Sequence, residues 1–158
     1  MSEELNIDTQ LGKEEKYQQL LLQLTALLAD EDDLIAKQAI FCAALKYSIG
    51  FFWVGFYKVQ GNELVLGPFQ GPVACTRISK GKGVCGTAWE EEQTIIVDDV
   101  DLFPGHIACS SLSKSEIVVP VFDASGKVAL VLDVDATEVN IFDEIDKKHL
   151  EQLVRLIY

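Results

Sequence analysis

The sequence predicts a single α+β domain in which an antiparallel sheet packs against helices. Apolar residues recur at helical spacing early in the chain, runs of branched and aromatic residues typical of strands fill much of residues 51–136, and an amphipathic helix closes the chain. With 158 residues, 49% of them hydrophobic and 24% charged, the chain can bury a core without a metal or disulfide staple. We expect a polar N-terminal segment over residues 1–12 and one domain over residues 13–158.

The first two helices are predicted from their apolar faces. Between residues 13 and 28 the apolar side chains recur three and four positions apart: Tyr17, Leu20, Leu21, Leu24, Leu27 and Leu28. Asp32 or Asp33 can cap the second helix, because a short polar side chain accepts hydrogen bonds from the backbone N–H groups at a helix start. We expect this helix to stop at Gly50. Cys42 lies among its apolar positions, which predicts a small buried core residue.

Strands follow Gly50. "FFWVGFYKV" and "ELVLGPF" flank the turn sequence "QGN" and predict a β-hairpin. "GKGVCGTAWEEEQ" predicts a glycine turn that opens a short helix over residues 84–91, and "TIIVDDV" predicts a strand. "SEIVVPVFD" and "VALVLDVDA" on either side of "ASGK" predict a second hairpin. The last helix is predicted to begin at a cap on Asp143, and His149, which lies among charged residues, is expected at the surface.

Charge and hydropathy exclude two classes of partner. The formal net charge of -12 disfavours nucleic acids and anionic membranes, because a phosphate backbone requires clustered Lys and Arg. No apolar run approaches the roughly 20 residues of a membrane span. Residues 1–10 lack the basic-then-apolar layout of a secretory signal. We therefore expect a cytoplasmic protein without nucleic-acid or membrane partners.

Three of the four cysteines lie close together in the sequence. Cys75, Cys85 and Cys109 are separated by ten and twenty-four residues, among glycine-rich turns. Structural zinc sites mostly use ligand pairs two to four residues apart, and only His106 and Cys109 have that spacing. In a reducing cytosol the group instead favours redox chemistry, in which one thiol becomes a sulfenic acid and another captures it as a disulfide. Cys85 lies between two glycines at a predicted helix start, which predicts a lowered thiol pKa.

Acidic and aromatic side chains occupy the predicted strands. Because successive strand residues point to opposite faces, Asp133 and Asp135 are predicted to share one face. A carboxylate pair suits either an ammonium ligand or a proton donor of raised pKa. Glu116 begins an otherwise apolar strand, and Trp53 and Tyr57 are four apart, on one face if their strand is regular. The alternatives are a solvated strand end for the aspartates and ordinary core packing for the aromatics.

Together, several of these segments resemble the free methionine-R-sulfoxide reductases, which are single GAF-domain enzymes. The segments are "FWVGFY", "ELVLGPFQGPVAC", "GKGVCGTA", "FPGHIAC", "SEIVVPVF" and "VLDVDA" with "FDEIDKKHLEQL". The resemblance covers nearly the whole chain, and generic GAF domains are not expected to carry the triple-cysteine pattern. It implies a GAF-like α+β domain with a central six-stranded antiparallel sheet, helices packed on one face and a ligand pocket on the other.

The resemblance also implies roles for the three thiols. Cys109 is similar to the family's nucleophile, which takes the sulfoxide oxygen, and Cys75 to its first resolving partner. Cys85 is similar to a third cysteine that also takes part in disulfide exchange, and the division of labour between Cys75 and Cys85 stays open.

The pocket residues are implied in the same way. Trp53 and Tyr57 match the family's pocket aromatics, and Glu116, Asp133 and Asp135 match its carboxylates; Glu116 or one of the aspartates is the candidate acid. The implied substrate is free methionine-(R)-sulfoxide.

Partners and rival functions follow from this comparison. The implied reductant is thioredoxin, whose electrons come indirectly from NADPH. The resemblance implies no bound cofactor and no metal in this protein. Family members often form dimers, so a homodimer is open. Two alternatives remain: a GAF-type module that binds a small molecule or senses oxidation without turnover, and a metal-binding protein that uses Cys109, His106 and another thiol.

Overall fold

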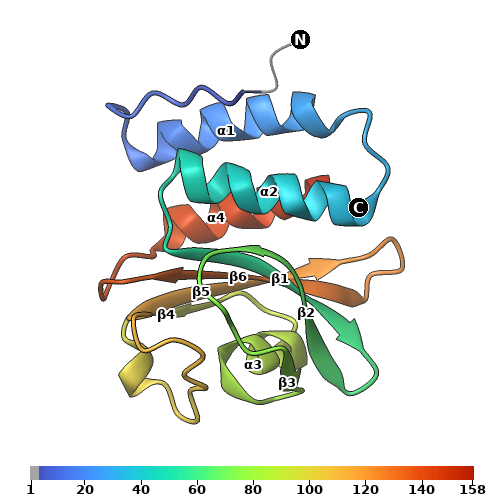
Figure 1. Cartoon of the computed structure of the whole chain (residues 1–158), viewed down its shortest axis with the longest axis vertical. Coiled ribbons are helices and arrows are strands. Elements are labelled where there is room, and N and C mark those ends of the chain that lie inside the picture. The colour runs from blue at the N-terminus through green and yellow to red at the C-terminus, as the bar shows by residue number, and fades with distance from the viewer. Residues whose placement is uncertain (1–3) are drawn as a thin grey trace.

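Six antiparallel strands form one sheet in the computed structural model of the chain, which describes residues 4–158 (Figure 1). The strands are β1 (Trp53–Gln60), β2 (Glu63–Gln70), β3 (Arg77–Ser79), β4 (Ile95–Val97), β5 (Ser115–Phe122) and β6 (Val128–Ala136). Their order across the sheet is β3-β2-β1-β6-β5-β4, so the two predicted hairpins meet at its centre through β1 and β6. The predicted α+β class and the six-stranded antiparallel sheet are confirmed.

Three helices cover one face of this sheet and a fourth covers the other. The helices are α1 (Lys13–Leu28), α2 (Leu34–Ser48), α3 (Gly83–Glu91) and α4 (Glu144–Leu153), with short 3-10 helices η1 (Val100–Leu102) and η2 (Val154–Leu156). In Figure 1, α1, α2 and α4 lie above the sheet, whereas α3 lies below it, beside the edge strand β3. The prediction of helices on one face holds for the three long helices, and α3 adds a short one on the pocket side.

The helix ends follow the sequence signals. The Asp33 side chain accepts a hydrogen bond from Ala36 N at 2.8 Å and caps α2. Asp143 caps α4 by accepting from the first backbone N–H groups of that helix. Gly50, just beyond α2, has a φ of +94°, a conformation that a residue without a Cβ adopts at little cost. These local signals therefore fix where the helix layer begins and ends.

Alternation along the strands divides the interior into two cores. Side chains that face α1, α2 and α4 are apolar, among them Val54, Phe56, Ile117, Val119, Leu130, Leu132 and Val134. Cys42 lies fully buried in this core, as predicted. The opposite face packs two aromatic side chains of β1 against α3, and its members include Trp53, Tyr57, Val84, Cys85, Ala88 and Trp89.

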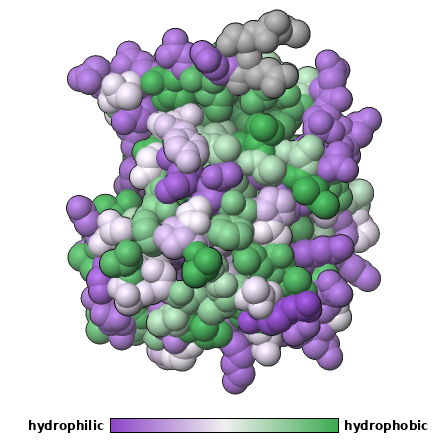
Figure 2. Space-filling model, viewed as in Figure 1, coloured by the Kyte–Doolittle hydropathy of each residue, from purple (hydrophilic) through white to green (hydrophobic). Residues whose placement is uncertain are grey.

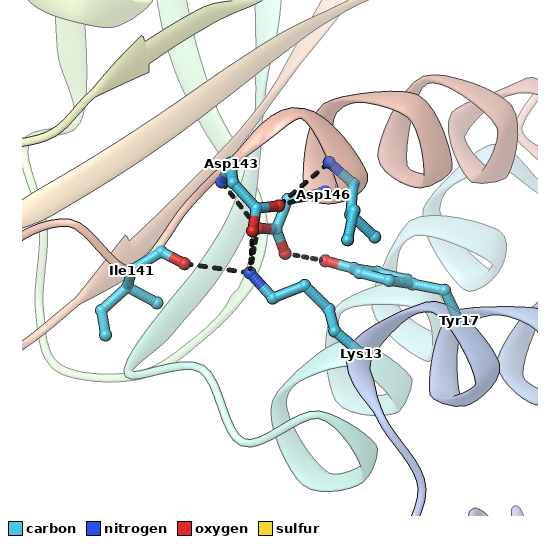
Figure 3. A network of polar contacts seen from close by, with 6 residues as sticks. Lys13, Tyr17, Ile141, Asp143 and Asp146 are labelled. Atoms are coloured by element: carbon cyan, nitrogen blue, oxygen red, sulfur yellow. Dashed lines mark hydrogen bonds and ion pairs between the residues drawn. The ribbon is translucent and has the colours of Figure 1, made fainter.

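A buried carboxylate joins α1 to the start of α4 (Figure 3). Asp146, only 1% exposed, accepts from Tyr17 Oη at 2.6 Å and from Lys13 Nζ at 2.7 Å. Lys13 Nζ also donates to the Ile141 carbonyl at 3.1 Å. Because all of these partners are polar and well placed, the charge is compensated, and the contact fixes α1 against the rest of the helix layer.

The expected surface position of His149 is wrong. Its side chain is 4% exposed, and its ring stacks on Tyr17 with the centroids 5.1 Å apart. His149 Nε2 lies 2.8 Å from Glu14 Oε1. The charged neighbours of His149 along the chain point elsewhere, because α1 covers the helix face that carries it.

The surface and the helices bear on the question of a membrane span. Figure 2 shows hydrophilic and hydrophobic side chains interspersed over the face seen in Figure 1. Within residues 4–158, none of the helices combines the length and the apolar character that crossing a membrane would require.

Candidate active site

A pocket lies on the sheet face opposite α1, α2 and α4, and the strand register sets its floor. Trp53 of β1 pairs with Asp135 of β6, which in turn pairs with Glu116 of β5, so these residues form one row across the sheet. Asp133 belongs to the next row on the same face and pairs with Gly55. The prediction that Asp133 and Asp135 share a face is confirmed, and both line the pocket.

The aromatic side of the pocket depends on a glycine in β1. Trp53 stacks on Phe69, with ring centroids 5.4 Å apart, and on Tyr57 at 6.2 Å. A Cβ at Gly55 would collide with the Trp53 ring and lie 2.7 Å from Phe69 Cβ. Gly55 therefore makes the space in which the indole lies flat over β1.

Two loops close the pocket, and a disulfide joins them. Cys75, between β2 and β3, is bonded to Cys109, between η1 and β5, with the Cα atoms 5.4 Å apart. The floor aromatics hold the first loop, because Tyr57 Oη donates to the Cys75 carbonyl at 2.9 Å and Trp53 Nε1 donates to the Pro72 carbonyl at 2.9 Å. The thiol pair that the sequence comparison implied is thus joined above the carboxylates.

The second loop touches the floor through a histidine. His106 lies three residues before Cys109, and its Nε2 is 3.5 Å from Glu116 Oε2. Burial lowers the pKa of His106, although the nearby Asp101 acts in the opposite direction. The imidazole is therefore mainly neutral at neutral pH and can form a hydrogen bond with the Glu116 carboxyl group.

Burial, and after it the charge of a neighbouring carboxylate, raises the pKa of each of the three carboxyl groups. Burial, followed by the charge of Asp135, raises the pKa of Glu116 to about 8. Burial and Glu116 raise the pKa of Asp133, and burial and Asp133 raise that of Asp135. Since neighbouring carboxylates in a dry site cannot all ionise, the group holds at least one proton at neutral pH. The pocket therefore offers a proton donor beside negative charge.

Cys85 corrects one prediction from the sequence. It lies at the start of α3, but it is buried, and its Sγ is 4.0 Å from Glu116 Oε1. Burial, followed by the charges of Asp133 and Glu116, raises the pKa of the Cys85 thiol, where the sequence predicted a lower value. The N-terminal end of this nine-residue helix stabilises a thiolate. The loss of water and the two nearby carboxyl groups destabilise the thiolate by more.

Seven of the eight predicted site residues line the pocket: Trp53, Tyr57, Cys85, Cys109, Glu116, Asp133 and Asp135. The eighth, Cys75, is brought to it by the bond to Cys109. Sequence reasoning missed Ser113, a buried lining residue whose hydrogen bond counteracts the raised pKa of Asp135. A serine in a loop carries no periodic signal that could have revealed it. The metal alternative through Cys109 and His106 lacks a thiolate in this form, because Cys109 is in the disulfide.

Comparison with known proteins adds a family to this geometry. The family model described as "GAF domain" matches residues 35–157. The chain is 58% identical over 158 residues to "GAF domain-containing protein A" of Dictyostelium discoideum, with 99% of both chains covered. It is 43% identical to the "Free methionine-R-sulfoxide reductase" of Saccharomyces cerevisiae, covering 99% of this chain and 91% of the relative.

A solved structure gives the same result. The free methionine-R-sulfoxide reductase of Neisseria meningitidis, determined in complex with its substrate, superposes with a TM-score of 0.95 at 47% sequence identity, covering 99% of this chain and 93% of that chain. Such identity over nearly full length goes well beyond a shared fold. The chain therefore belongs to the GAF-domain family of free methionine-R-sulfoxide reductases.

Proposed function

We propose that this protein reduces free L-methionine-(R)-sulfoxide to methionine by a sulfenic acid and disulfide mechanism. The observation that carries the proposal is the Cys75–Cys109 disulfide joined above a group of buried carboxyls. An oxidisable thiol pair beside a proton donor is what the reduction of a sulfoxide requires. The choice of substrate and of the R epimer rests on the similarity to relatives that are free methionine-R-sulfoxide reductases.

Glu116 is our candidate for the acid. The sulfur of a sulfoxide is a poor electrophile until its oxygen is protonated or strongly hydrogen-bonded, so catalysis needs a donor with a pKa near or above the working pH. Glu116 is 5% exposed, and with a pKa of about 8 it is protonated at neutral pH. His106, at 3.5 Å from Glu116, connects this buried acid to the Cys109 loop.

The chemical step balances with two electrons from one thiol. The oxygen passes from the sulfoxide to Cys109: an S–O bond forms at the Cys109 thiolate sulfur, the S–O bond of the sulfoxide breaks, and its electron pair stays on the sulfur of the methionine that leaves. Glu116 gives its proton to the transferred oxygen, so Cys109 becomes a sulfenic acid. The Cys75 thiol then attacks this sulfur, releases water and forms the disulfide. The structure is compatible with this product state, because Cys75 and Cys109 are bonded in it.

Cys85 has a more limited part in this scheme. It is not bonded to either of the other two thiols, it is buried, and its raised pKa keeps it protonated at neutral pH. A protonated thiol attacks slowly, so we assign resolution to Cys75. A role of Cys85 in later disulfide exchange stays a prediction.

Recognition of a free amino acid follows from the remaining groups. The Trp53 ring can pack on the S-methyl group, which becomes more positive as the oxygen is protonated. Asp133 and Asp135 can hold the α-ammonium group. The first backbone N–H groups of α3, which has no side-chain cap, can hold the α-carboxylate. A peptide-bound methionine sulfoxide has neither charged end, so it would leave these groups unpaired and be rejected.

Recycling needs an external dithiol, and we propose thioredoxin, reduced in turn at the expense of NADPH. Cys75 and Cys109 are both partly exposed, which leaves their bond open to attack from solution. The scheme uses no resident cofactor or metal, since every proton and electron comes from side chains and the dithiol. The homodimer implied by the family also stays a prediction.

The test is a stereochemically resolved assay of free methionine sulfoxide with thioredoxin, thioredoxin reductase and NADPH, run beside a peptide-bound sulfoxide. We expect consumption of the free R epimer only. Turnover of neither epimer by folded protein with reduced thiols would instead favour a GAF module that binds a ligand or senses oxidation. Turnover of the peptide would contradict the proposed pairing of both charged ends.

A further inference from the structure

Three potential metal ligands converge beneath the disulfide. One ligand atom each of Cys85, Glu116 and Asp133 lies within 4.8 Å of the other two, and all three residues are buried. They come from α3, β5 and β6, so neighbouring parts of the fold hold them independently. None of them is a partner in the disulfide, and Cys85 keeps a free thiol.

Asp133 carries one buried oxygen atom without a partner. Asp133 is 7% exposed, and its Oδ1 is fully buried without a hydrogen bond. Across residues 4–158, no lysine or arginine forms an ion pair with Glu116, Asp133 or Asp135. A buried carboxylate oxygen without a donor is costly, so this side of the cluster favours a cation.

We propose that the disulfide form of this protein binds one Zn²⁺ ion through Cys85 Sγ and one carboxylate oxygen each of Glu116 and Asp133, with water in the fourth position. Zn²⁺ accepts sulfur and oxygen ligands in a tetrahedral site, whereas Mg²⁺ and Ca²⁺ select oxygen alone. Ligand atoms of such a site lie about 3.4–3.6 Å apart. Because the three atoms lie within 4.8 Å of one another, each separation has to shrink by at most about 1.4 Å.

The surroundings fit a bound metal in two further ways. His106 Nε2, 3.5 Å from Glu116 Oε2, is placed to hydrogen-bond a metal-bound carboxylate, as outer residues of zinc sites commonly do. The ion also compensates charge, because a thiolate and two carboxylates carry three negative charges and Zn²⁺ offsets two. Each proton held by the thiol or the carboxyls leaves as the metal binds, so the affinity rises with pH.

The site goes beyond the proposed reaction and makes Zn²⁺ an inhibitor of it. The ion would occupy the acid and part of the ammonium site, so metal and substrate exclude each other. That exclusion rests on the proposed function; the metal site itself rests only on the three side chains and on the unpartnered oxygen.

The test is metal binding by the oxidised full-length protein after treatment with a chelator. In this form Cys42 and Cys85 are the free cysteines, and Cys42 lies in the helix-side core. We expect one Zn²⁺ per chain by calorimetry with release of protons, and a thiolate-to-metal charge-transfer band when Co²⁺ is used as the probe. Cys85→Ala should remove the band and weaken Zn²⁺ binding at least tenfold. Cys42→Ala should keep the band and the wild-type affinity for Zn²⁺.

A second variant guards against misfolding of the first. Asp133→Asn keeps the shape of the side chain and should also weaken Zn²⁺ at least tenfold, with an unchanged circular dichroism spectrum. A Co²⁺ complex of the wild-type protein without a charge-transfer band would overturn the site. So would equal Zn²⁺ affinity of folded wild-type protein and both variants. Because no step of this test measures reductase activity, its failure is distinct from failure of the proposed function.

Discussion

On the sheet face covered by α1, α2 and α4, the side chains of β5 and β6 are apolar: Ile117, Val119, Val121, Leu130, Leu132, Val134 and Ala136. On the pocket face the same two strands carry Glu116, Asp133 and Asp135. Both faces arise because successive side chains of a strand point to opposite sides of the sheet. A change of one position along β5 or β6 thus moves from a residue that stabilises the fold to one that serves the pocket.

The two faces also handle buried charge differently. On the helix side, Asp146 receives hydrogen bonds from Tyr17 and Lys13 and is compensated. On the pocket side, Glu116 and Asp133 lie against each other and a thiol, with raised pKa values and, for Asp133 Oδ1, no partner. The pocket face therefore stores unfavourable interactions that a ligand, a proton or a metal can relieve, and such sites are typically functional.

Among variants that keep all of the thiols, the largest effect is expected from Glu116→Gln. Removing a general acid costs about 10²–10⁴-fold in rate, and the variant should fold normally because glutamine has the same shape. For the wild-type protein, kcat/KM should fall as the pH rises through about 8, where Glu116 loses its proton. Stopped-flow measurements over a pH series check both points. A similar decline above pH 8 in Glu116→Gln would assign the acid to another residue.

Leu132→Ala tests the helix-covered face. Deleting a fully buried leucine should cost about 2–5 kcal/mol of unfolding free energy through lost burial and the remaining cavity. The activity of the folded fraction should stay close to wild type, since the side chain points away from the pocket. Urea unfolding gives the first value, with Leu22→Ala, at a position 75% exposed, as a control near zero. Lost activity without lost stability would contradict the division between the faces.

A smaller effect is expected from Tyr17→Phe. Phenylalanine keeps the ring that stacks on His149 but removes the hydrogen bond to Asp146, which should cost about 1.5–3 kcal/mol because the acceptor is a buried charge. Thermal unfolding at neutral pH measures it, with the exposed Tyr47→Phe as the control. An unchanged melting temperature would show that Lys13 alone compensates Asp146.

The last effect concerns the pH dependence of stability. The folded-state pKa of Glu116 is about 8, above the ordinary glutamate pKa of 4.5, so between these values the folded state binds more protons than the unfolded one. The stability from this group is present below about pH 4.5 and is lost as the pH rises through 8. Glu116→Gln should flatten that decline in denaturant unfolding at pH 5, 7 and 9. An equally steep decline in the variant would assign it to the aspartates.

Much of the fold could be predicted because its signals are local. Asp33 and Asp143 cap helices by bonding to residues two or three positions away, and alternation alone placed Asp133 and Asp135 on one face. β3 escaped prediction because only one of its three residues, Ile78, is apolar, so the strand depends on pairing with β2.

The site was less predictable wherever distant segments decide the chemistry. The pKa of Cys85 depends on Glu116 and Asp133, thirty-one and forty-eight positions further along the chain. The burial of His149 depends on Tyr17, from the other end of the chain. Spacing in the sequence cannot show which of these groups meet.

The central claim is that Cys109 takes the oxygen of a free sulfoxide and passes its oxidation to Cys75. It is tested most directly by a single turnover: reduced protein is mixed with excess free methionine-(R)-sulfoxide without reductant, and methionine and disulfide-linked peptides are quantified. We predict one methionine per chain and a Cys75–Cys109 bridge, none of either with Cys109→Ser, and one methionine without that bridge in Cys75→Ser. Methionine formation by Cys109→Ser, or a wild-type bridge through Cys85 alone, would contradict the account.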